Sequence, residues 1–292
     1  MNVNLELYRV FYYVAKHLSF SVASQVLYLS QSAVSQSIKQ LETKLNTPLF
    51  NRSTKQVTLT PQGIKLMEYI EPALNLIAGG EAYLKETMTL DRGQLHIGAS
   101  DTICKYYLLD YFKKFHHLYP GVEIRVTNRT SLQCVALLKK GLVDLIVTNL
   151  PNPSISDDMQ VMPVLDFQDV FIASNKYNIA SESHTLQSLS KHPILMLAKQ
   201  TTTSNYLYQL FESEGLSIKP SVELGSIDLL IDLTGIDLGI SFVPDFCMKN
   251  RPNFRILKTC KPIPRRQLGV VIPEKRPLSE ASKKFIALLS KF

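Results

Sequence analysis

The stretch that decides the fold is "SQSAVSQSIKQLE", residues 30–42. Its apolar residues, continued by Leu45, recur at steps of four, three and four, which places them on one stripe of a helix: Val34, Ile38, Leu41 and Leu45. Ser30 directly precedes the run and is expected to be the N-cap. The opposite face carries mainly Ser and Gln. Taken alone, such a face is typical of an ordinary solvated helix.

The residues before this helix change that interpretation. Two more apolar stripes lie upstream, Leu7, Phe11, Val14 and Leu18 in the first and Val22, Ala23, Val26 and Leu27 in the second. Only residues 28–30 remain for a turn between the second and third helices. So short a connection is typical of a helix-turn-helix, whose second helix enters the DNA major groove. Ser and Gln suit that role because they offer both donors and acceptors to base edges.

The charge of this segment and the residues after it support a DNA-binding domain over residues 1–60. The segment holds six basic and two acidic side chains, and so contributes +4 to the net charge of +7. Basic character alone is weak evidence for binding to nucleic acid. The following stretch, "LFNRSTKQVTLT", predicts two short strands at 50–52 and 56–59, which would form a winged hairpin. Arg52 and Lys55 could then reach the DNA backbone or minor groove.

A longer run, "SFSVASQVLYLSQSAVSQSIKQLETKLNTPLFNRSTKQVTLTPQG" at 19–63, resembles the DNA-binding domain of LysR-type transcriptional regulators. The shared pattern comprises Ser-Phe at 19–20, Ala23, Ser-Gln at 30–31, Ala-Val-Ser at 33–35, Leu-Glu at 41–42, Leu-Phe at 49–50, Arg52, Leu-Thr at 59–60 and Gly63. Ser32, Gln36 and Ser24 depart from it, standing where Pro, Arg and Ala are usual. The departures affect which bases are read. The residues predicted to bind DNA are Gln31, Ser32, Ser35, Gln36, Lys39, Arg52 and Lys55.

A linker helix is expected over 61–90, because Thr60 can cap it and Pro61 is tolerated in a first turn. Apolar residues follow at alternating steps of three and four, with Glu81 in one position: Met67, Ile70, Leu74, Ile77, Leu84 and Met88. This heptad pattern predicts pairing with a second helix; packing against the chain's own core is the alternative. Pro72 and Gly79-Gly80 weaken the helix interior. The resemblance implies dimerisation here, a dimer or tetramer, and a palindromic operator in double-stranded DNA.

Beyond residue 91, short apolar strand candidates alternate with helical patterns, which predicts an α/β architecture with largely parallel sheets. The strand candidates are 94–100, 122–127, 144–148, 169–174, 193–197, 238–244 and 268–273. The stretch beginning "SDTICKYYLLDYFKKF" at Ser100 resembles the effector-binding domain of the same family, a fold akin to periplasmic solute-binding proteins. That resemblance implies one subdomain at 92–164 and 266–292 and another at 165–265, with two crossing strands as the hinge.

A small-molecule effector would bind between these subdomains. Three strand-to-helix junctions, at 100–102, 128–131 and 200–204, place hydroxyls and free backbone amides at helix starts, which favour an anion. Simple N-capping is the alternative for any one of them. The predicted effector-binding residues are Ser100, Asp101, Thr102, Asn128, Arg129, Thr130, Ser131, Thr148, Thr201, Thr202, Thr203 and Ser226. Arg129 is the only cation in the three junctions, so directed hydrogen bonds to a small carboxylate, amino acid or oxyanion are expected.

Other classes of protein find less support. The sequence has no GxSxG, Walker, HExxH or GxGxxG motif, and Asp228, Asp232 and Asp237 lack an evident acid–base partner, so no enzyme is expected. A solute-binding protein of a transport system is the alternative function, but it would not need residues 1–60. No long apolar run or signal peptide is evident, which favours the cytoplasm. RNA polymerase is an expected partner of such a regulator.

The cysteines and histidines give no sign of a metal or a cofactor. The four cysteines are widely spaced, which argues against zinc and against a disulfide framework: Cys104, Cys134, Cys247 and Cys260. Most are expected to be buried thiols, with Cys104 the candidate for a redox role. His116 and His117 are adjacent in a helical pattern and point about 100° apart, so they seldom share a metal.

Overall fold

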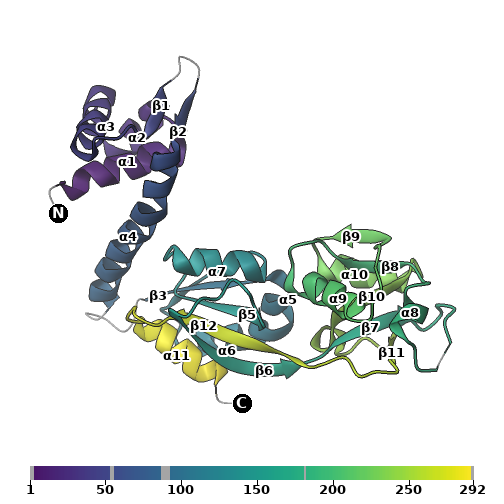
Figure 1. Cartoon of the computed structure of the whole chain (residues 1–292). Helices are drawn as coiled ribbons and strands as arrows, with labels where there is room; N and C mark the ends of the chain where they lie inside the picture. Colours follow the sequence, from purple (N-terminus) through teal and green to yellow (C-terminus); the bar gives the residue numbers. More distant parts are fainter. Residues whose placement is uncertain (1–2, 53–55, 87–92, 181, 291–292) are drawn as a thin grey trace. The chain divides into compact units, whose positions relative to one another are not determined.

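The computed structural model describes residues 3–52, 56–86, 93–180 and 182–290 (Figure 1). The chain divides into two compact units, Met1–Lys85 and Glu86–Phe292. The first unit contains α1 (Leu5–His17), α2 (Phe20–Leu27), α3 (Gln31–Leu45), β1 (Phe50–Arg52), β2 (Val57–Leu59) and most of α4 (Pro61–Glu86). Within the described residues, no helix combines the length and apolar character that a membrane crossing requires.

The three short helices enclose the core predicted from the sequence. Val34, Ile38 and Leu41 of α3 are fully buried together with Ala23 of α2. Ser30 caps α3 by accepting a hydrogen bond from the Ala33 amide at 3.2 Å. The stripe predicted for α2 is partly wrong, since Val22 and Val26 are 40% and 43% exposed. The helix has only eight residues, so Ala23 and Leu27 suffice to cover its contact with the core.

A left-handed residue ends α2, and the side-chain carboxylate of Glu42 holds the start of the wing. Tyr28 adopts a left-handed conformation (φ 55°) that ends α2. Glu42 at the end of the motif accepts hydrogen bonds from the amides of Leu49 (2.8 Å) and Phe50 (3.2 Å), which fixes the start of the antiparallel β1–β2 wing. A Cβ on Gly63 would lie 2.2 Å from the Leu49 carbonyl oxygen, so only glycine fits there. Contacts within the first unit therefore explain why Glu42 and Gly63 occur in the shared motif.

The long helix α4 continues through Pro72 and the two glycines to Glu86. The first two residues of the heptad pattern, Met67 and Ile70, pack against the core of the first unit. Packing on the chain's own core, the alternative given above, thus accounts for this part of the heptad pattern. Farther along, Ile77 and Leu84 are exposed. Met88 lies outside the described residues.

The second unit contains two five-stranded sheets, each with helices against it (Figure 1). The first sheet has the order β4-β3-β5-β12-β6, with β3 (Gln94–Ala99), β4 (Glu123–Asn128), β5 (Leu145–Leu150), β6 (Met159–Phe167) and β12 (Arg266–Pro273). The second has the order β11-β7-β10-β8-β9, with β7 (Asp169–Ser174), β8 (Ile194–Leu197), β9 (Val222–Leu224), β10 (Ile240–Pro244) and β11 (Phe254–Leu257). We call the parts built on these sheets subdomain one and subdomain two.

The helical elements of the second unit connect these strands. They are α5 (Asp101–Ile103), η1 (Cys104–Leu108) and α6 (Leu109–Leu118), which follow one another directly, then α7 (Ser131–Lys139), α8 (Leu186–Leu189), α9 (Thr202–Glu212), α10 (Ile227–Gly235), η2 (Asp245–Met248) and α11 (Glu280–Leu289). α7 and α9 each begin directly behind a strand of their own subdomain, after β4 and β8. This arrangement brings the helix starts to the carboxyl ends of parallel strands.

The prediction of largely parallel sheets is wrong, because both sheets are mixed. β3 is parallel to β4 and β5, and β8 is parallel to β9 and β10. β12 is antiparallel to both β5 and β6, and β7 is antiparallel to both β10 and β11. The antiparallel strands are those that carry the chain between the sheets. Such a crossing strand enters its sheet without a connecting helix, and it need not follow the parallel direction.

The chain passes between the subdomains twice, at Gln168 between β6 and β7 and at 258–265 between β11 and β12. The two crossings lie side by side, since Phe167 pairs with Arg266 in the first sheet. Two crossing segments were expected, but β6 extends to Phe167, past the boundary predicted at residue 164. The apolar alternation of β6 is interrupted by Pro163 and Asp166, so its sequence did not identify it as a strand.

Candidate functional site

The outer face of α3 presents the predicted DNA-binding side chains. Gln31, Ser32, Gln36 and Lys39 are exposed, and Ser35 is half-buried. Because Ile38 and Leu41 fill the core on the other side, this face is available to a partner. Ser32 also contacts Ser30 through their hydroxyls at 2.9 Å, so it belongs partly to the helix cap.

The side chains of the two predicted wing residues, Arg52 and Lys55, are not described. Arg52 ends β1, but only its backbone is described, and Lys55 lies outside the described residues. An aromatic residue that sequence reasoning missed is Tyr28, in the turn before α3, whose side chain is 95% exposed. Its left-handed backbone, which non-glycine residues rarely adopt, sets its side chain outside the core. No periodic pattern marks such a residue.

A cavity of about 260 Å³ lies in the second unit, with walls from both subdomains. Ten of the twelve predicted effector-binding residues line it: Ser100, Asp101, Thr102, Asn128, Arg129, Thr130, Ser131, Thr201, Thr202 and Thr203. The other two do not. Thr148 is fully buried in β5, where its hydroxyl bonds within subdomain one, and Ser226 caps α10 beside the lining residue Gly225.

Three of the lining hydroxyls are used by the helices that they begin. Ser100 accepts a hydrogen bond from the Ile103 amide (3.4 Å) and Thr201 from the Ser204 amide (3.1 Å). Thr130 forms a capping box with Gln133. The N-capping alternative therefore holds for these three residues. The next residues in the two longer helices, Ser131 in α7 and Thr202 in α9, are not caps.

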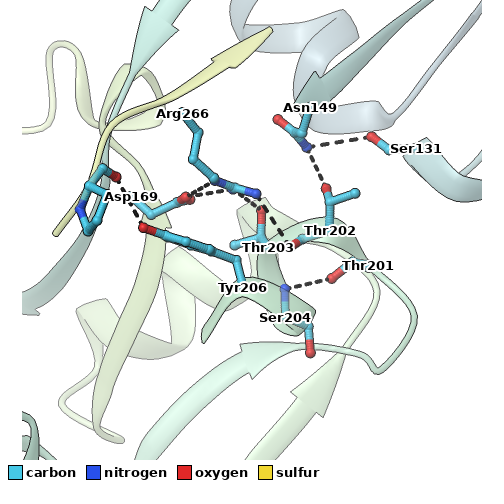
Figure 2. Close-up of polar contacts among 10 residues, drawn as sticks. Ser131, Asn149, Asp169, Thr201, Thr202, Thr203, Ser204, Tyr206 and Arg266 are labelled. Atoms are coloured by element: carbon cyan, nitrogen blue, oxygen red, sulfur yellow. Dashed lines mark hydrogen bonds and ion pairs between the residues drawn. The ribbon is translucent and has the colours of Figure 1, made fainter. Parts of the chain in front are cut away.

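Asn149, which sequence reasoning missed, joins the two subdomains across this cavity. Its Nδ2 donates to Thr202 Oγ1 at 2.8 Å and to Ser131 Oγ at 3.5 Å (Figure 2). Asn149 lies near the end of a strand of subdomain one, and Thr202 begins a helix of subdomain two. One amide thus contacts the first turns of both α7 and α9. The signal in the sequence was weak, because Asn149 sits inside the apolar run "LIVTNL".

Arg266 is a second residue that sequence reasoning missed, directly behind the α9 wall. Its guanidinium pairs with Asp169 and donates to Thr203 Oγ1 at 3.2 Å and to the Thr202 carbonyl oxygen at 3.4 Å (Figure 2). The rings of Tyr206 and Phe167 lie 4.6 and 5.1 Å from its guanidinium carbon. Arg266 therefore links the crossing segments to the start of α9.

A further polar cluster joins the subdomains away from the cavity lining. Asp228 of α10 accepts hydrogen bonds from Lys105 (2.7 Å) and from the hydroxyl of Tyr106, and Arg251 donates to the same hydroxyl at 2.7 Å. Partial burial acts to raise the pKa of Asp228, but the hydrogen bonds from Lys105 and Tyr106 and the nearby cations hold it below its usual value. Asp228 therefore connects α10 to η1 of subdomain one and to Arg251.

Comparison with solved structures finds one architecture over nearly the whole chain. A full-length OxyR variant from Pseudomonas aeruginosa covers 99% of this chain, with 94% of that chain covered, at a TM-score of 0.70 and 19% identity. CbnR, a LysR family transcriptional regulator, gives a TM-score of 0.69 at 16% identity over 99% of this chain and 100% of its own. CbnR complexed with its target DNA matches equally well, at a TM-score of 0.69 and 16% identity over 98% and 99%. These likenesses show the fold.

Sequence comparison identifies the family. The model of the bacterial regulatory helix-turn-helix protein of the lysR family matches residues 5–64, and the LysR substrate binding domain matches residues 89–292. The HTH-type transcriptional regulator GltR of Bacillus subtilis is 30% identical over 243 residues, 83% of this chain and 80% of that protein. The RuBisCO operon transcriptional regulator of Allochromatium vinosum is 29% identical over 246 residues, 83% and 80% of the two chains. This chain belongs to the LysR family of transcriptional regulators, which are not enzymes.

Proposed function

We propose that the chain regulates transcription by binding a palindromic operator as a dimer or tetramer and by sensing a small anion in the cavity between its subdomains. Such a protein acts in the cytoplasm, where the operator and RNA polymerase are accessible. Membership of the LysR family argues against the alternative of a transport solute-binding protein without a regulatory role. The single observation that carries the sensing proposal is the cavity lined by the starts of α7 and α9.

In DNA binding, we assign base reading to Gln31, Ser35 and Gln36, with Ser32 beside them. These neutral side chains can both donate to and accept from base edges, so they discriminate between bases. Lys39, Arg52 and Lys55 would contact phosphate or the minor groove, where a cation gains mainly from the release of counterions. Gln36 and Lys39 are both exposed on α3, so both side chains can reach DNA.

Self-association would use the exposed part of α4. Ile77 and Leu84 lie on the heptad stripe and are 44% and 66% exposed, which leaves a large apolar surface in contact with water in the single chain. A second α4 would bury that surface, and two-fold pairing would present two recognition helices to the two halves of a palindrome.

In sensing, an anion would accept hydrogen bonds from the free amides of the first turns of α7 and α9 and from the hydroxyls of Ser131 and Thr202 in those turns. Because these two helices belong to different subdomains, the ligand would contact both and bind best at one angle between them. Its binding energy would then favour that angle over others, and the change would alter operator occupancy or bending. Asn149 bridges the same two helix starts through its side-chain amide.

Isothermal titration calorimetry of the full chain with small anionic and neutral metabolites tests this function, with Thr202→Val as the matched variant. Valine keeps the shape of threonine but removes its hydroxyl, so it should weaken binding of the anion by about 5- to 150-fold. Tight binding of a cationic or wholly apolar compound that Thr202→Val does not weaken would contradict the proposal. So would the absence of binding by every anion tested.

A further inference from the structure

We infer that the effector is a small amino acid: next to its carboxylate it carries an amine that donates hydrogen bonds to Asn149 and Asp101. This inference rests on the proposed function, in which the cavity binds an anion, and it narrows the ligand to a zwitterion. It depends on a buried acceptor, on the charges in the cavity wall, and on the size of the cavity.

The buried acceptor is Oδ1 of Asn149. Asn149 is 8% exposed, and its Nδ2 is used by Thr202 and Ser131. Oδ1 lies on the other side of the amide (Figure 2) and has no hydrogen-bond partner among the described residues. A buried carbonyl oxygen without a donor is costly, and such groups are rare in folded proteins. Oδ1 itself has almost no exposed surface, so a ligand in the cavity that Asn149 lines would supply this donor once the amide turns toward it.

The charges in the wall point the same way. Among the described residues that line the cavity, Asp101 and Arg129 are the only charged ones, so their formal charges cancel. Asp101 is exposed, and its carboxylate accepts a single described hydrogen bond, from Nδ2 of Asn128 at 3.2 Å. Arg129 donates to the Asn128 carbonyl oxygen at 2.7 Å. A wall with one carboxylate and one guanidinium is electrostatically complementary to a ligand with one charge of each sign.

A ligand with an anionic group alone fits this wall less well. It would gain the helix-start amides and Arg129, but it would leave Oδ1 of Asn149 without a donor and would place like charge near Asp101. An ammonium group offers three donors, enough for Asn149 and Asp101 together. An uncharged amine or hydroxyl would serve Asn149 but would gain less from the carboxylate.

The cavity volume limits the size of the ligand. About 260 Å³ lies just below the range typical of ligand pockets and holds roughly nine water-sized groups, at about 30 Å³ each. The smaller amino acids, up to the size of glutamate, are of this order. The lining is rich in hydroxyls and amides, with few apolar residues, Ile103, Leu197 and Pro244. A short or polar side chain therefore suits the cavity better than a large apolar one.

The test compares matched pairs of probes by calorimetry with the full chain. Glycine, alanine, serine, aspartate and glutamate are each titrated beside the acid in which hydrogen replaces the amino group: acetate, propionate, 3-hydroxypropionate, succinate and glutarate. Sulfate serves as an anion without carbon. At least one amino acid should bind about 10- to 100-fold more tightly than its deaminated partner, since hydrogen bonds to charged groups are the strong ones.

Variants then assign the preference to residues. Asp101→Asn should reduce the ratio between amino acid and deaminated acid at least tenfold, mainly by weakening the amino acid. Asn149→Leu should also reduce the ratio, whereas Asn149→Asp, which keeps an acceptor and adds a negative charge, should keep the ratio at least as large as in the natural chain. Asp110→Asn makes the same charge change at an exposed position outside the lining and should leave the ratio unchanged.

Each alternative result has a distinct meaning. If the deaminated acids or sulfate bind the natural chain as tightly as the amino acids, the inference is wrong while the anion site stands. The same holds if Asp101→Asn and Asp110→Asn have equal effects on the ratio. If neither amino acids nor deaminated acids nor sulfate bind at all, both the inference and the proposed anion site are wrong.

Discussion

Arg266 and Asp169 form an ion pair inside the protein, with Nε and Nη2 of the arginine 2.7 and 2.5 Å from one carboxylate oxygen. The two side chains are 3% and 0% exposed. Asp169 begins the strand after the first crossing between the subdomains, and Arg266 begins the strand after the second. The pair therefore ties the two crossings to each other, and through Thr203 it ties both to the first turn of α9.

Replacing Arg266 by methionine should lower the free energy of unfolding of the second unit by about 3–5 kcal/mol, because it leaves the Asp169 carboxylate buried without its cation. Methionine is unbranched and apolar, so it replaces the aliphatic part of the arginine and removes the guanidinium that lies over the Tyr206 ring. The double variant Arg266→Met/Asp169→Leu should recover most of the loss, since no charge then remains buried. Urea denaturation followed by circular dichroism measures both. Equal destabilisation in the single and double variants would show that packing, and not the ion pair, is responsible.

Gln36→Ala should weaken binding to the preferred operator by about 1–3 kcal/mol and reduce discrimination among operator variants, because a neutral amide that reads a base edge is lost. Lys39→Ala, on the same exposed face, and Lys55→Ala should instead weaken binding to all sequences alike and lower the salt dependence. Selection of bound DNA from a random pool, followed by fluorescence anisotropy at several salt concentrations, separates the two effects. An unchanged preference in Gln36→Ala would remove this residue from the base-reading set.

Ile77→Asp should abolish assembly through α4, since pairing would bury a carboxylate between two helices at a cost of several kcal/mol. Tight operator binding should be lost with it, while the second unit stays folded. Leu76→Asp is the matched control, because Leu76 has a similar exposure, 49% against 44%, but lies off the heptad stripe. Analytical ultracentrifugation measures the assembly. The same mass for Ile77→Asp and the natural chain would mean that the stripe packs elsewhere.

Cys260 should react with iodoacetamide at pH 7.5 far faster than the other cysteines. Burial raises the pKa of the Cys104 thiol to about 11 and that of Cys134 to about 12, so both are almost wholly protonated at that pH, and the thiolate is the reactive form. Cys260 is exposed. Mass spectrometry of peptides follows the labelling, with Cys260→Ser as the control. Fast labelling of Cys104 would restore it as a candidate for redox sensing.

The sequence predicted the first unit well because its signals are local. The stripe of Val34, Ile38 and Leu41, the cap at Ser30 and the short turn all lie within a few residues of the helix that they define. The sheets of the second unit were predicted less completely. β6, β9 and β11 were not identified, since they are short, edge-lying or interrupted by Pro163, and their partners lie far away in sequence.

The residues of the candidate site also divide into those that local sequence predicts and those that it does not. Helix starts such as Ser131 and Thr202 carry a recognisable residue pattern, and most of the predicted junction residues do line one cavity. Asn149 and Arg266 show no recognisable sequence pattern. Each lies in a strand, and its role depends on contacts with residues more than fifty positions away. Thr148 was also predicted to bind the effector, but its place in β5 turns its hydroxyl into subdomain one.

At the helix starts, the residues that cap the helix differ from the residues that follow the cap, and this difference has an evolutionary consequence. Ser100, Thr130 and Thr201 cap their helices, whereas Ser131 and Thr202, each one residue after a cap, line the cavity and are not caps. If the cavity binds the effector as proposed, substitutions of Ser131 and Thr202 would change which compound is recognised while the helices remain capped. A duplicated copy of such a gene could acquire a response to a new compound through one or two changes that leave its folding intact.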